Sequence, residues 1–268
     1  MKVFFSLNLL VLAAGLFAGC SPNSSGKFQG YVEGEYVYVA SPLGGALTNL
    51  AVARGDEVKS GQLLFELERG SEAAAVRQAE KNLAQAKANL ALSESEFARR
   101  KQLRNNNGVI SAEELDQSRT QRNADAAQVA SQQAALDKAK WAFDQKQQFA
   151  PANAFVQDTL YRQGEWVAAE NPVVVLLPPE NLKARFFVPQ EMLPRIKTGE
   201  NVSVTFDGAT KNYSATVNYI STQAEFTPPV LYNRENRAKL IFMIEAKFSP
   251  ADAAELRPGQ PVDVKISP

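Results

Sequence analysis

The chain has 268 residues, enough for about one to three small domains, and its 29 basic side chains balance its 29 acidic ones. A net charge of zero gives no general affinity for nucleic acid or for an anionic membrane. Histidine is absent from the sequence, which excludes imidazole metal sites, Ser-His-Asp and Cys-His pairs and the commonest general base. We therefore expect a protein that is not an enzyme, with no catalytic residue and no metal site.

The N-terminus has the pattern of an export signal. An apolar run of about 15 residues follows the basic Lys2, and it is shorter than the roughly 20 residues of a membrane span. Residues 16–20, Leu-Phe-Ala-Gly-Cys, resemble a bacterial lipobox, with Phe where Leu is usual. By that resemblance residues 1–19 are a signal peptide, Cys20 carries an N-terminal lipid, and 20–36 form the anchor and tether. The alternative is an ordinary signal beside an unmodified cysteine, an exposed thiol in an oxidising compartment.

Two distant segments share one pattern of turns and short strands. Residues 42–67 read PLGGALTNLAVARGDEVKSGQLLFEL, and residues 151–177 read PANAFVQDTLYRQGEWVAAENPVVVLL. In each, a proline lies 13 residues before a glycine, and an acidic residue and a valine follow at equal offsets: Pro42, Gly55, Asp56, Val58 and Pro151, Gly164, Glu165, Val167. Gly-acid-x-Val alone is ordinary turn-and-strand chemistry, but the shared spacing predicts one β-sandwich split into 37–70 and 149–180.

The first of these segments resembles half of a biotinyl or lipoyl carrier domain, which presents one modifiable lysine at a hairpin turn. Here residues 68–72 read Glu-Arg-Gly-Ser-Glu, and the next lysine is Lys81. We therefore expect no lipoyl or biotin group and no other cofactor, because an inserted segment replaces the carrier hairpin.

The insertion, residues 71–148, is expected to be an antiparallel helical hairpin. It has no proline and one internal glycine, Gly108, and it is rich in strong helix formers. On each arm large apolar residues recur every seven residues, with one interruption at Arg122. The repeat comprises Val76, Leu83, Leu90 and Phe97, with Ala79 and Ala86 beside them, and then Leu115, Val129, Leu136 and Phe143. Arms of about 33 residues make a rod of roughly 50 Å. We therefore expect the hairpin to span a distance and not to hold a small-molecule pocket.

The turn of the hairpin, residues 99–116, carries capping signals and an apolar spot. The run from Asn105 to Gly108 suits a left-handed C-terminal cap, and Ser111 with Glu114 forms a capping box for the second helix. Val109 and Ile110 are apolar at an exposed turn, which indicates a contact surface. Four cations lie where they suit the helix dipole, so a structural and a contact role both remain open for them: Arg99, Arg100, Lys101 and Arg104. Neighbouring acids argue against nucleic acid as a partner.

The C-terminal part, residues 181–268, alternates short strands with Gly, Pro and Asn turns, which is typical of a small β-barrel. Strands are expected over 182–190, 201–208, 213–221, 240–248 and 261–268.

This order of parts resembles the HlyD-like periplasmic adaptor, or membrane fusion, family. The family's tip motif is an Arg, a Leu four residues later and a Ser further along, and Arg99, Leu103 and Ser111 match it with one residue more than usual before the serine. By this resemblance the motif, with help from Val109 and Ile110, docks on a TolC-like outer-membrane channel. Leu103 departs from the seven-residue repeat, so we expect it to face outward.

The resemblance also implies an architecture and partners. The fold class is mixed α and β, elongated and multidomain, with a coiled-coil hairpin in a split lipoyl-like β-sandwich followed by a β-barrel. The turns at 193–202 and 255–262 look like the paired turn motifs of the family's barrel. The segments 224–229 and 234–242 resemble adaptors of ABC-type exporters, although AEFTPP is also an ordinary rigid loop. The resemblance further implies a hexameric ring, an inner-membrane transporter as partner and a location in the periplasm of a Gram-negative bacterium. Anchoring in the inner membrane is favoured, and the leaflet stays open.

Three functions remain possible from the sequence. The first is an adaptor that links an inner-membrane transporter, ABC-type or proton-driven, to an outer-membrane channel. The second is an acyl or biotin carrier, or an enzyme subunit built from the lipoyl-like halves, against which the missing lysine and the absence of histidine argue. The third is a structural envelope lipoprotein that takes no part in transport.

Overall fold

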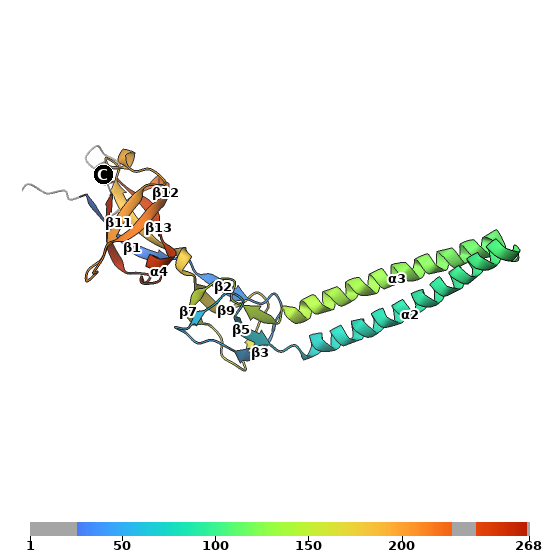
Figure 1. Cartoon of the computed structure of the whole chain (residues 1–268). Helices are drawn as coiled ribbons and strands as arrows, with labels where there is room; N and C mark the ends of the chain where they lie inside the picture. The colour runs from blue at the N-terminus through green and yellow to red at the C-terminus, as the bar shows by residue number, and fades with distance from the viewer. Residues whose placement is uncertain (1–25, 227–239, 267–268) are drawn as a thin grey trace, which may run out of the picture. The chain divides into compact units, whose positions relative to one another are not determined.

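The computed structural model describes residues 26–226 and 240–266. The chain divides into two compact units, Met1–Gly34 with Glu180–Pro268, and Glu35–Pro179. The described part of the first unit is a closed β-barrel, and the second unit joins a β-sandwich to a helical hairpin (Figure 1). The predicted lipobox with Cys20, and residues 227–239 of the segment compared with ABC-type adaptors, lie outside the described residues.

The sandwich has two four-stranded sheets, and each sheet takes strands from both halves of the split domain. One sheet has the order β2 (Val37–Ala40), β9 (Pro172–Leu177), β7 (Ala154–Thr159), β4 (Glu57–Val58). The other has the order β6 (Gln147–Phe149), β5 (Leu63–Leu67), β3 (Gly45–Leu50), β8 (Trp166–Val167). The predicted split fold is therefore confirmed, and the two halves interlock.

The halves are related by an internal repeat of 109 residues, the spacing from Gly55 to Gly164. The Gly55 N–H donates to the Val156 carbonyl at 2.8 Å, and in the equivalent bond Gly164 donates to Leu47 at 2.8 Å. One core lies between the sheets, and its fully buried members come from both halves, among them Leu47, Leu64, Phe65, Val156 and Val173.

The insertion is a hairpin of two long helices, α2 (Gly70–Asn107) and α3 (Ala112–Asp144), as the heptad pattern predicts (Figure 1). The chain leaves β5 and returns to β6, which pair through Leu63–Phe149 and Glu66–Gln147. Residues 147 and 148, expected in the insertion, begin β6 instead, because the returning strand must pair along β5 up to Glu66.

The residues buried between the two helices change from apolar to polar along the length of the hairpin. Near the sandwich, Ala79, Leu83 and Leu136 form a buried cluster with Val76, Val129 and Ala139 packed against it. Towards the turn, the buried residues are Ser93 and Ser118. The interruption of the repeat at Arg122 has a physical reason: its guanidinium lies 4.9 Å from the ring centroid of Phe97, so a cation–π contact replaces an apolar pair.

A charged clamp fixes the base of the hairpin to the sandwich. Lys146 is buried, and its Nζ donates to the Gly44 carbonyl at 2.6 Å and pairs with Glu72 at 3.2 Å. Burial raises the pKa of Glu72, but hydrogen bonds from Ser71, from its own backbone and from Lys146 outweigh that effect and lower the pKa. Arg69 pairs with Glu66 at 2.7 Å and lies over the ring of Phe143.

The barrel closes in the order β1 (Lys27–Gly34), β10 (Leu182–Pro189), β13 (Leu240–Phe248), β12 (Tyr213–Phe226), β11 (Asn201–Thr205), β14 (Pro261–Ile266). The assignment of residues 27–34 to a tether is wrong, since β1 joins β10 to β14 and closes the barrel. Phe28 and Val32 are buried inside, and Gly30 lies so close to the Arg185 carbonyl that a side chain would clash.

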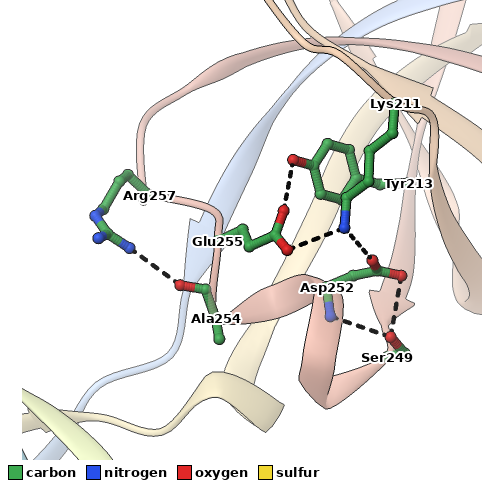
Figure 2. Close-up of polar contacts among 7 residues, drawn as sticks. All are labelled: Lys211, Tyr213, Ser249, Asp252, Ala254, Glu255 and Arg257. Carbon is green, nitrogen blue, oxygen red and sulfur yellow. Dashed lines mark hydrogen bonds and ion pairs between the residues drawn. The ribbon is translucent and has the colours of Figure 1, made fainter.

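Polar contacts tie the turn before β12 to the short helix α4 (Pro250–Ala253), as Figure 2 shows. Lys211 Nζ donates to Asp252 at 3.2 Å and to Glu255 at 3.0 Å, and the Tyr213 hydroxyl donates to Glu255 at 3.0 Å. The two hydrogen bonds lower the pKa of Glu255. Ser249 caps α4 by accepting from the Asp252 N–H at 3.2 Å.

A second charge network crosses three neighbouring barrel strands. Glu245 on β13 accepts from Lys183 and Arg185 on β10, each at 2.8 Å, and Arg185 pairs with Glu33 on β1 at 2.6 Å. The side chains of Lys183 and Glu245 are only 9% and 11% exposed. Burial raises the pKa of Glu245, but its bonds to Lys183 and Arg185 have the larger combined effect and lower it. Leaving either charge unpaired is therefore costly.

Replacement of residues 71–144 by a short Gly/Ser turn is expected to leave a folded protein, because β5 and β6 already lie side by side. Fragment 35–70 alone is expected to stay unfolded, since every sheet of the sandwich needs strands from both halves. Circular dichroism and thermal melting check both forms. A cooperatively folded fragment would contradict the interlocked topology.

Glu245→Gln is expected to lower the free energy of unfolding by about 3 kcal/mol near neutral pH, since it leaves the buried Lys183 and the half-buried Arg185 with less compensation. The carboxylate has a lowered folded pKa, so its contribution is present above its ordinary value of 4.5 and is lost as pH falls through the folded pKa. The gap between wild type and variant should therefore shrink in denaturant titrations below pH 4.5. A gap that stays constant with pH would contradict the ionic role.

Candidate docking site at the hairpin tip

The turn between α2 and α3 is held by caps at both helix ends. Gly108 has φ 63° and donates its N–H to the Arg104 carbonyl at 3.2 Å, which closes α2 in the left-handed conformation. The Ser111 hydroxyl accepts from the Glu114 N–H at 3.1 Å, and the Ser111 N–H donates to the Glu114 carboxylate at 2.9 Å. The predicted capping box is confirmed.

Ser111 has little hydrogen-bonding capacity left for a partner. Its hydroxyl also donates to the Glu114 carboxylate at 3.0 Å, so its one proton is used within the turn. The backbone and side-chain bonds from Ser111 lower the pKa of Glu114. A partner protein can therefore only donate a hydrogen bond to the Ser111 hydroxyl, which would act as the acceptor.

The four cations of the tip separate into two pairs. Arg100 and Arg104 are half-buried and donate across the turn to the carbonyls of Glu114 at 3.5 Å and Ile110 at 3.4 Å. Sequence reasoning left their role open, although Arg104 stands seven residues after Phe97, on the seam position of the repeat. Arg99 and Lys101 are exposed and have no hydrogen bond or ion pair within the described ranges.

Arg99 and Leu103 share one face of α2, because residues four apart lie one helical turn from each other. Leu103 is 40% exposed, as its departure from the repeat predicts, and Val109 at the turn is 73% exposed. Ile110 is half-buried. The tip therefore presents an unpaired guanidinium and two exposed apolar side chains, while Ser111 and Ile110 belong mainly to the turn itself.

Among the described residues no group of three or more His, Cys, Asp or Glu side chains is placed to hold a metal ion. Within the same ranges no helix is both long and apolar enough to cross a membrane.

The hairpin matches a known family. The family model described as "RND MFP, alpha-helical hairpin domain" covers residues 75–146. The chain is 28% identical to a UPF0194 membrane protein of Yersinia pseudotuberculosis serotype O:3, a match that covers 88% of each protein. It is 26% identical to the UPF0194 membrane protein YE2891 of Yersinia enterocolitica, over 99% of this chain and 98% of that protein.

Solved structures with a similar fold include a membrane fusion protein. The membrane fusion protein Spr0693 of Streptococcus pneumoniae R6 is 19% identical with a TM-score of 0.67, over 90% of this chain and 98% of its own. MacA of Actinobacillus actinomycetemcomitans is 17% identical with a TM-score of 0.61, over 90% and 78%. The chain therefore has the fold of the membrane fusion protein Spr0693, and its residues 75–146 match the hairpin domain of the family model.

Proposed function

We propose that this protein is the periplasmic adaptor of a tripartite efflux or secretion system of a Gram-negative bacterium. It links an inner-membrane transporter to a TolC-like outer-membrane channel and performs no catalysis. One observation carries the proposal: a long hairpin, set into a split sandwich, ends in an exposed Arg99 without a partner in the described structure, beside the exposed Leu103 and Val109.

The tip has chemistry suited to the end of a helical channel. The Arg99 guanidinium donates a planar fork of hydrogen bonds to carbonyls or carboxylates, which an ammonium cannot copy. Leu103 and Val109 supply apolar area that is desolvated on contact. The helices of 38 and 33 residues hold this contact roughly 50 Å from the sandwich. A ring of about six copies would surround one conduit and leave substrate selection to the transporter.

Two observations bear on the class of transporter. Residues 224–229 and 234–242 resemble adaptors of ABC-type exporters, and we propose that class. The hairpin family model carries the name RND, which keeps a proton-driven pump as the second candidate. Co-purification of the tagged adaptor with its membrane partner decides between them.

The carrier alternative is opposed by chemistry at the insertion. Lys146, the lysine nearest β6, is 5% exposed, and its Nζ is held by the Gly44 carbonyl and Glu72. An acyl or biotin group needs a free amine on an exposed turn. The mass of the mature protein, measured intact, distinguishes the two functions. Normal export in a deletion strain with altered envelope mechanics would instead favour the structural lipoprotein.

Cys20→Ser is expected to release the folded protein from membranes, because we propose that the lipid on Cys20 is the anchor. Fractionation and circular dichroism measure location and fold, and the wild type is the control. A variant that stays membrane-bound after a salt wash would contradict the lipid anchor.

Substitution of Ser111 separates capping from docking. Ser111→Ala should cost about 1 kcal/mol of helix stability, whereas Ser111→Asn keeps an equally good cap. If Ser111 acts only through the cap, channel crosslinking is reduced in Ser111→Ala and retained in Ser111→Asn. Loss of crosslinking in both, with Ser111→Asn as stable as wild type, would assign the hydroxyl to the contact.

The double variant Arg99→Asp/Leu103→Ser is expected to abolish crosslinking to the channel and export, with thermal stability and transporter association nearly unchanged. Both side chains are exposed, so their loss costs the hairpin little. Lys101→Asp is the matched control, since it makes the same charge change at an exposed residue outside the motif. Wild-type export from the double variant would show that the tip is purely structural.

A further inference from the structure

The outer segment of the hairpin, residues 90–128, lacks the apolar packing that holds the rest of the hairpin, its inner segment, together. Within the described helices the buried apolar side chains all lie in the inner segment: Ala79, Leu83, Ala86 and Leu136. In the outer segment no apolar side chain that the structure describes is buried. Leu90, Phe97 and Leu115 keep the seven-residue repeat there, but each of them is only half-buried.

A polar crevice of about 220 Å³ lies between the helices of the outer segment. It is lined by Ser93, Glu96, Arg100, Gln117, Ser118 and Gln121. The two serines are buried, but their hydroxyls donate to the carbonyls of Leu90 and Leu115, each on the same helix as its serine. Glu96 is half-buried and has no hydrogen bond or ion pair within the described ranges. Closing this crevice therefore removes polar groups from water without pairing them across the seam.

The polar contacts that join the two helices of the outer segment are few in the described structure. The guanidinium of Arg122 lies 4.9 Å from the ring centroid of Phe97. Arg100 and Arg104 donate across the turn at 3.5 and 3.4 Å, which is long for a hydrogen bond. Long helices in proteins draw most of their stability from packing against a neighbour. A segment with so little packing and so few bonds to its neighbour opens at low cost.

We infer that the outer segment of the hairpin opens and closes as a unit while the inner segment stays paired. In the open state the two helices separate, and water solvates the six polar side chains that line the crevice. The buried cluster around Leu83 and Leu136 and the pair of Lys146 with Glu72 hold the inner segment in both states. The spacing of the two helix ends at the tip is then adjustable. This opening is a property of the free chain and requires no partner.

Two cysteines at equivalent seam positions test the opening by thiol labelling. Ser93 stands seven residues after Ala86, at the same position of the repeat, and both residues are 5% exposed. In the full chain with Cys20→Ser, the single replacements Ser93→Cys and Ala86→Cys each provide the only thiol. The thiol at position 93 is expected to react about tenfold faster than the thiol at position 86, because only the outer segment opens. The same difference is expected with a small methanethiosulfonate and with a bulky maleimide linked to polyethylene glycol.

The two reagents distinguish opening of the helices from entry through the crevice. Separation of the helices admits both reagents, whereas a fixed crevice of about 220 Å³ admits only the small one. Equal rates at positions 93 and 86 would overturn the inference. A faster reaction at position 93 with the small reagent alone would overturn it too, because the helices would then stay together.

Hydrogen exchange measured by mass spectrometry adds a readout without cysteines. Ser118→Leu places apolar volume in the crevice and should slow amide exchange in the outer segment by about tenfold, with the inner segment unchanged. Ser118→Ala adds no bulk and should slow exchange by a smaller factor. Ser131→Leu is the matched control, because Ser131 is exposed on the same helix.

Two results of the exchange measurement would contradict the opening. One is wild-type exchange that is equally slow in both segments, and the other is exchange in the outer segment that neither Ser118 variant slows. Both assays use the adaptor without a channel. Their failure would therefore leave the docking result of Arg99→Asp/Leu103→Ser untouched, and the two proposals fail separately.

Discussion

One turn, repeated in both units, holds the β-structure together. In each copy a glycine with positive φ donates its N–H to a carbonyl remote in sequence, and the next side chain accepts from a backbone N–H three residues earlier. The glycines are Gly55, Gly61, Gly164, Gly199 and Gly259, and the accepting side chains are Asp56, Gln62, Glu165, Glu200 and Gln260. A side chain at these positions would be strained, and an apolar residue after the glycine would leave a backbone donor unpaired. A short local motif thus sets long-range strand pairing.

The repeat explains why a carrier domain can lose its carrier. Gly55 and Gly164 make equivalent bonds into opposite halves, so the sandwich is complete without the turn between β5 and β6. A helical hairpin can therefore replace that turn while the sandwich keeps all of its strands. By the same repeat, the end of β5 corresponds to the end of β9, after which the chain continues into the barrel. The two large additions to the sandwich are therefore attached at equivalent strand ends, outside its core.

Elements with a periodic sequence pattern could be predicted from the sequence, whereas the strand that closes the barrel could not. The split sandwich, the heptad arms and five barrel strands were predictable because each has a local pattern that burial requires. The strand at 27–34 was not, since its alternation of Phe28, Gly30 and Val32 is short and its pairing partners lie at least 148 residues away. At the tip, the caps and the exposed Leu103 were predictable, whereas the inward roles of Arg100 and Arg104 depend on carbonyls that only the folded turn presents.

The two ends of the hairpin differ in how strongly their helices are held together. Near the sandwich, buried Leu83 and Leu136 each contribute about 1.5–3 kcal/mol of apolar burial, and the Lys146–Glu72 clamp orients the base. Towards the tip the buried residues are Ser93 and Ser118, whose hydroxyls bond to carbonyls of their own helices at 3.0 and 2.8 Å and add little cohesion between the helices. Apolar burial between the two helices is therefore concentrated at the base of the hairpin.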